Sequence, residues 1–155
     1  NRYYFLTGYN YNIQMEDDQA GIMCTGYRVI DRKLYYFDKD GGCCGVCGPK
    51  NGWYDVNGTR YYMIEGKVAS GMLNINGVDY AFARDGKMYA NEIVSTDIIN
   101  KICYANADGS IVTTRGWHLT SYGYIFVQQG GEVCTGIHTI DGVTYMFGSD
   151  GILMY

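Results

Sequence analysis

Residues 52–63 read GWYDVNGTRYYM, and the pattern of this stretch decides the fold. The Asn57-Gly58 pair at its centre is the kind of dipeptide that two-residue type I′ turns prefer, because both turn residues need positive φ angles. The flanking segments, 52–56 and 59–63, are rich in aromatic and β-branched residues, as short strands are. The stretch therefore predicts a two-stranded β-hairpin.

The same pattern recurs along the chain at intervals of about 20 residues. A single hairpin is at best marginally stable in water, so neighbouring hairpins must bury their apolar faces against one another. The sequence thus predicts an all-β fold, a solenoid of stacked two-stranded β-hairpins. The recurrence is a glycine followed nine residues later by a tyrosine at Gly26/Tyr35, Gly52/Tyr61, Gly71/Tyr80 and Gly136/Tyr145, with a copy one residue shorter at Gly116/Tyr124.

These repeats predict a single β-hairpin repeat module over residues 1–155. Residues 92–102 also have helical spacing, because Val94, Ile98 and Ile102 fall four apart, but they fit an irregular repeat as well, and we favour the strand interpretation. The expected pieces are a partial repeat with an insertion (1–25), a repeat with a Cys-rich loop (26–51), two repeats (52–70 and 71–90), the irregular repeat (91–115), a further repeat (116–135) and a terminal repeat (136–155).

The composition excludes several functional classes. The chain has 17 tyrosines and 22 glycines but only 12 lysines and arginines against 16 acidic residues, for a net charge of −4. That balance is unsuited to binding a nucleic acid or an anionic membrane surface, and we expect neither as a partner. No apolar run of about 18 residues indicates a membrane span.

The repeats resemble the cell-wall-binding, or choline-binding, repeats of Gram-positive surface proteins. The pattern of that family is roughly GW, a turn, a YYF-like strand, an Asp-Gly turn and a TG; glucan-binding domains and the C-terminal repeats of clostridial toxins share much of it. The resemblance implies a non-catalytic, secreted or cell-surface module that anchors an attached domain to a choline-bearing wall polymer or a glucan-type polysaccharide. It is carried by residues 25–37, 51–63, 115–126 and 135–147.

In the choline-binding branch, the resemblance implies a cage that holds a quaternary ammonium between consecutive hairpins. Its walls are the aromatic residue of the GW position, the first aromatic of the YYF-like strand and an aromatic of the next repeat. Aromatic ring faces attract such a cation without any carboxylate. The implied ligand-binding residues are Tyr27 and Tyr35 closed by Tyr61, Trp53 and Tyr61 closed by Tyr80, and Trp117 and Tyr124 closed by Tyr145.

The GW position departs from this pattern in several repeats, where it holds Met72, Ile93 or Ile137. A cage at those positions lacks one wall. Rows of tyrosine and tryptophan also stack on pyranose rings, so a glucan or wall glycan remains an equal alternative to choline. Any of these rings can instead be core, and Tyr36 and Tyr62, the second of each pair, are expected to face away from the first and to pack. The alternative function is a structural spacer or protein-interaction repeat domain with degenerate ligand sites.

Six cysteines leave fifteen pairings open, and the sequence favours a local disulfide or free thiols. The spacing of Cys44 and Cys47 fits half a zinc site, but only His118 and His138 are available as further ligands without a second closely spaced pair. Neither histidine is set for catalysis with a cysteine. We expect no metal, no cofactor and no catalytic residue. The cysteines are Cys24, Cys43, Cys44, Cys47, Cys103 and Cys134.

Overall fold

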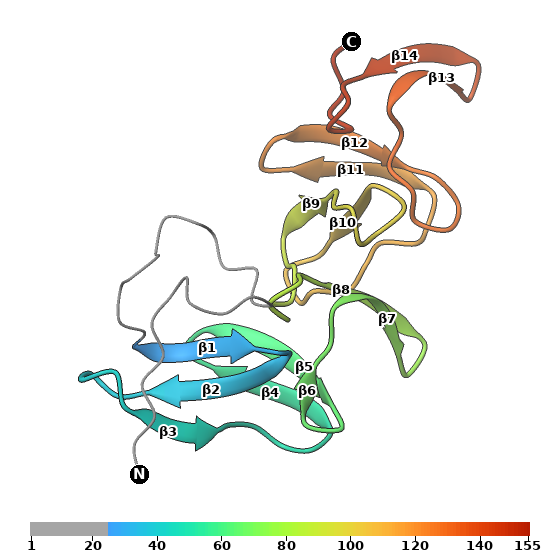
Figure 1. Cartoon of the computed structure of the whole chain (residues 1–155). Helices are drawn as coiled ribbons and strands as arrows, with labels where there is room; N and C mark the ends of the chain where they lie inside the picture. The colour runs from blue at the N-terminus through green and yellow to red at the C-terminus, as the bar shows by residue number, and fades with distance from the viewer. Residues whose placement is uncertain (1–24) are drawn as a thin grey trace. The chain divides into compact units, whose positions relative to one another are not determined.

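The computed structural model describes residues 25–155, and within that range all regular secondary structure is β-strand. The described residues belong to two compact units, one ending at Ala69 and the other spanning Ser70–Tyr155 (Figure 1). The predicted partial repeat 1–25 lies outside the described residues except for its last residue, and Cys24 lies outside them as well. The segment 92–102, which has helical spacing, contains no helix: residues 92–94 form a strand and residues 95–102 form turns and irregular chain, so the strand interpretation is confirmed at 92–94 only.

Consecutive strands pair as antiparallel hairpins, as the sequence predicts. In the first unit, β3 and β6 each add a short third strand to a hairpin. The strands of the first unit are β1 (Gly26–Ile30), β2 (Lys33–Phe37), β3 (Cys43–Val46), β4 (Gly52–Val56), β5 (Thr59–Ile64) and β6 (Lys67–Val68). Those of the second are β7 (Gly71–Ile75), β8 (Val78–Phe82), β9 (Glu92–Val94), β10 (Cys103–Ala105), β11 (Gly116–Thr120), β12 (Gly123–Val127), β13 (Gly136–Ile140) and β14 (Val143–Phe147).

The Asn-Gly and Asp-Gly hairpin turns have positive φ angles at both positions, for example 51° at Asn57 and 75° at Gly58, which confirms the type I′ prediction. The turn between β1 and β2 was not foreseen, because its residues are Asp31 and Arg32, at φ 49° and 62°. The Arg32 guanidinium donates hydrogen bonds of 3.0 and 3.3 Å to the carbonyl oxygen of Val68. This tether offsets part of the strain of a left-handed arginine.

After each hairpin the chain turns back and pairs once more with the end of the second strand. In the second unit these returns are single bridges, such as Val127 with Val133 and Phe147 with Leu153. The return also bonds to the preceding repeat, since the Val133 amide donates to the Ile102 carbonyl (2.8 Å). Backbone hydrogen bonds therefore join successive repeats.

Each hairpin has two faces, which we call front and back. The front face carries the GW position and the residue opposite it, as Trp117 lies opposite Phe126; the back face carries the alternate residues, among them Ile125. The register also corrects the idea of a shortened repeat at 116–124. Gly116 pairs with Val127 just as Gly136 pairs with Phe147, so this hairpin has full length and its buried Ile125, not Tyr124, occupies the position of the first tyrosine.

The core lies between hairpins, where the front face of one packs on the back face of the next. We call each such contact a seam. In the first unit, Tyr27, Val29 and Leu34 on the front face of β1–β2 pack on Tyr54, Val56, Tyr61 and Met63 on the back face of β4–β5. In the second unit, the seams join Met72 and Ala81 to Val94, Cys103 and Ala105, then Ile93 and Tyr104 to Ile125 and Val127, and then Phe126 to Ile140, Tyr145 and Phe147.

Candidate binding sites at the hairpin seams

Trp117 is the centre of the seam between β11–β12 and β13–β14. Its ring centroid lies 5.1 Å from that of Phe126, directly opposite on β12, and 4.9 Å from that of Tyr145 in the next hairpin. The Phe147 ring stacks at 5.9 Å. Trp117 nevertheless stays 38% exposed. This seam is an aromatic cluster with one side open to solvent.

Tyr124 lies on the same front face as Trp117, opposite Leu119, and is 51% exposed. The three implied residues therefore meet at a single seam: Trp117 and Tyr124 lie on the front face of one hairpin, and Tyr145 lies on the back face of the next. We find Trp117 and Tyr145 in edge-to-face contact. Such a contact gives an aromatic pair favourable quadrupole geometry and fixes the two rings relative to one another.

The seam of the first unit brings together Tyr27 and Tyr61 but not Tyr35. Tyr27 and the buried Tyr61 share one cluster, whereas Tyr35 lies opposite Arg28 on the back face of its hairpin. The ring beside Tyr27 is instead Tyr36, at 5.0 Å between centroids. Tyr36 is 38% exposed, so a residue outside the implied ligand set lies at the open side of this hairpin face.

Trp53 likewise has Tyr62 as its neighbour, with ring centroids 5.1 Å apart, while Tyr61 lies on the opposite face of the hairpin. Tyr80 is on β8 of the second unit, opposite Leu73. The position of the hairpin turn is enough to predict which ring lies beside Trp53. A two-residue turn at Asn57-Gly58 pairs residues symmetrically about it, which places position 62 opposite position 53.

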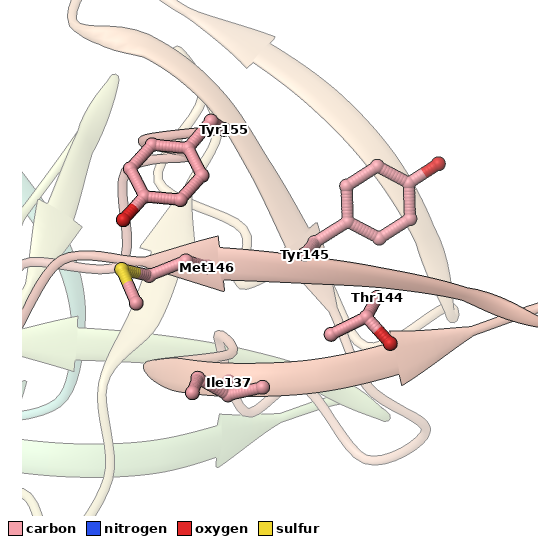
Figure 2. Close-up of a pocket in the computed structure, with 5 residues that line it drawn as sticks. All are labelled: Ile137, Thr144, Tyr145, Met146 and Tyr155. Carbon is pink, nitrogen blue, oxygen red and sulfur yellow. The ribbon is translucent and has the colours of Figure 1, made fainter.

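At two of the three GW positions without an aromatic residue, the seam is filled. Met72 and Ile93 each pack in an apolar cluster. Ile137 differs, because the front face of β13–β14 forms a shallow pocket of about 120 Å³ and leaves Ile137 68% exposed. Figure 2 shows Ile137 on β13, the residues of β14 beside it and Tyr155 near Met146. The lining residues are Ile137, Thr144, Tyr145, Met146 and Tyr155.

An arginine lies over a ring in each hairpin that contains tryptophan. The Arg60 Cζ is 4.9 Å from the centroid of Trp53, and the Arg115 Cζ is 4.8 Å from that of Phe126. A carboxylate holds each guanidinium. Asp55 accepts from Arg60 at 2.8 and 3.3 Å. Asp141, in the β13–β14 turn, accepts from Arg115 at 3.0 Å.

The five cysteines among residues 25–155 are free thiols. Within the same range, the structure holds no cluster of three or more histidine, cysteine or acidic side chains suited to a metal ion. A ring nitrogen of His138 lies 2.9 Å from the Thr135 carbonyl oxygen, a local contact within its own repeat. No helix in the described part of the chain is long and apolar enough to cross a membrane.

The thiols should differ strongly in reactivity. Cys103 is fully buried, and burial raises its pKa to about 11, whereas Cys44 is exposed. Because the thiolate is the reactive form, a pKa raised by about two units lowers its population roughly 100-fold near neutral pH. We expect iodoacetamide to label Cys44 in the native protein and Cys103 only after unfolding, as mass-spectrometric mapping would measure. Equal labelling rates in the folded protein would contradict the burial of Cys103.

No protein-family model matches the chain. Two relatives are each named Glucosyltransferase-S. The protein from Streptococcus downei is 28% identical over 145 residues, which cover 87% of this chain and 10% of the relative. The protein from Streptococcus mutans serotype c is also 28% identical, covering 86% of this chain and 10% of the relative. The chain thus spans about a tenth of the length of these relatives.

Solved structures with the same fold include choline binding protein F from Streptococcus pneumoniae in the presence of a peptidoglycan analogue. It is 26% identical with a TM-score of 0.54, and the match covers 98% of this chain and 49% of that one. CbpJ from Streptococcus pneumoniae has a TM-score of 0.56 at 24% identity over 98% of this chain and 49% of that one. At 24% identity, the similarity to CbpJ supports a shared fold and nothing more.

Proposed function

We propose that this chain, whose repeats are similar to choline- and glucan-binding repeats, is a non-catalytic module that binds a bacterial wall polymer or an extracellular glycan. In this role it tethers an attached domain to the cell surface or to secreted polysaccharide. The relatives support the proposal, since a stretch similar to this chain makes up a tenth of a glucosyltransferase. A similar fold also occurs in choline binding protein F, which was crystallised in the presence of a peptidoglycan analogue.

The observation that carries the proposal is the open aromatic seam around Trp117. A ring that served only as core would be buried, because exposing apolar area loses about 25 cal/mol per Å². Trp117 and Tyr124 keep 38% and 51% of their surface exposed on one face. Fixed, partly exposed rings present a preorganised surface to a ligand, which reduces the entropy lost on binding.

A second candidate function is a rigid spacer. It is favoured by Met72 and Ile93, which occupy GW positions and pack in apolar clusters. Under this alternative, the remaining aromatic rings stabilise the stack and bind nothing. The two functions make different predictions for the same variants.

Trp117→Ala should reduce binding by about tenfold, since one aromatic wall contributes roughly 1–2 kcal/mol. Calorimetric titration with choline and with a dextran oligosaccharide, together with co-sedimentation with purified Gram-positive cell walls, measures the change. Trp117→Phe should restore part of the affinity. Tyr122→Ala is the control, because Tyr122 is exposed in the β11–β12 turn. A folded wild-type protein that binds none of the three probes would refute the binding function and favour the spacer.

A further inference from the structure

The arginines over the two tryptophan-bearing hairpins bear on which ligand these sites accept. Arg60 projects from the front face of β4–β5, where Asp55 and Trp53 also lie. Arg115 comes from a different place in its repeat, directly before β11, and its carboxylate partner belongs to the next hairpin. The two arginines thus occupy different positions in their repeats, yet each places its guanidinium within 5 Å of a ring centroid.

These guanidinium groups are anchored and permanently charged. The Nε of Arg60 and one of its terminal nitrogens each meet an oxygen of Asp55, a bidentate arrangement that limits rotation of the side chain. Arg115 is tied to Asp141 across the seam. Arginine does not lose its proton in proteins, so the charge persists at every physiological pH.

A guanidinium over a ring occupies the negatively polarised ring face that would otherwise attract a quaternary ammonium. A second cation could reach that ring face only by displacing the guanidinium from the ring and from its carboxylate. A neutral sugar meets no such repulsion. It stacks its apolar face on the ring, and its hydroxyls find donors on the guanidinium and acceptors on the carboxylate.

We propose that Arg60 determines ligand class, making the Trp53 site select a neutral, polyhydroxylated glycan over a quaternary ammonium compound. The inference rests on the proposed function and narrows its ligand. Arg60 acts as a specificity-determining residue because it covers a face of the Trp53 ring and supplies hydrogen-bond donors in its place. Arg115 covers Phe126, which is 3% exposed, and so takes no ring face from a ligand. Asp55 keeps the Trp53 site close to electrically neutral.

The test uses Arg60→Gln, Arg115→Gln and the double variant, titrated with choline chloride and separately with a dextran oligosaccharide. Selective excitation of tryptophan reports only on these sites, because the chain has tryptophan at positions 53 and 117 alone. Arg60→Gln should strengthen choline binding by about three- to thirtyfold, the range of one cation–π contact, and should weaken oligosaccharide binding, whereas Arg115→Gln should leave choline binding unchanged. Opposite changes for the two probes are not expected of variants that merely loosen the fold.

Arg84→Gln is the matched control, because Arg84 also pairs with a carboxylate, that of Asp97. It should change neither affinity, and thermal melting of every variant checks that it is folded. Wild-type protein that binds choline through its tryptophan sites, with no gain in the double variant, would overturn the selectivity while leaving the binding function intact. Parallel loss of both ligands in the variants would overturn it as well. Failure of the folded wild type to bind either probe or cell walls would instead refute the proposed function.

Discussion

Gly131→Ala should destabilise the second unit by about 2–4 kcal/mol. Gly131 has φ +91°, and a Cβ there would lie 2.8 Å from the carbonyl oxygen of Val112 and 3.5 Å from the Cα of Thr113, both in the preceding repeat. Relief of this contact requires the backbone of one repeat to move away from the next. Urea denaturation followed by circular dichroism measures the change in the free energy of unfolding.

Gly142→Ala is the matched control, because Gly142 has a similar φ of +85° but has nothing within 4 Å of an added Cβ. It should lose only the conformational part, about 1 kcal/mol, since alanine is strained at positive φ. The difference between the two variants isolates the close approach of successive turns. Equal destabilisation by the two substitutions would show that this approach contributes nothing to stability.

The sequence predicts the hairpins well because their determinants are local. Asn57-Gly58 and Asp141-Gly142 specify the turn, and two-residue turns fix the cross-strand register on either side. The Asp31-Arg32 turn escapes this logic, since an arginine at positive φ is held by a contact with Val68, 36 residues away in sequence. Long-range tethers of this kind leave no local trace.

The candidate sites were predictable in part. The GW positions and their tyrosine-rich surroundings identify the seams, yet the choice of Tyr35 and Tyr61 as partners of Tyr27 and Trp53 within their own hairpins conflicts with strand alternation. The rings directly opposite are Tyr36 and Tyr62. The contribution of Arg115 could not be read from the sequence, because its position depends on Asp141, 26 residues further on, in another hairpin.

Phe126→Ala should lower the free energy of unfolding by about 3–4 kcal/mol, as removal of a buried aromatic ring does. Phe126 is 3% exposed. Its ring contacts Trp117 and lies under the Arg115 guanidinium, and it shares one apolar cluster with Phe147. Chemical denaturation gives the total loss. Hydrogen exchange gives its location, and we expect the largest acceleration in the amides of β13 and β14.

The reason for a local response is that each repeat contacts only its neighbours, so a weakened seam releases the hairpin beyond it before the rest. Ile125→Ala tests this directly, because Ile125 is equally buried but lies on the back face of the same hairpin, packed with Tyr104 and Val133. Its loss should accelerate exchange across the seam between β9–β10 and β11–β12. If both variants raised exchange uniformly over residues 70–155, the second unit would unfold as one cooperative body, and ligand binding at Trp117 would then stabilise every hairpin of the unit equally.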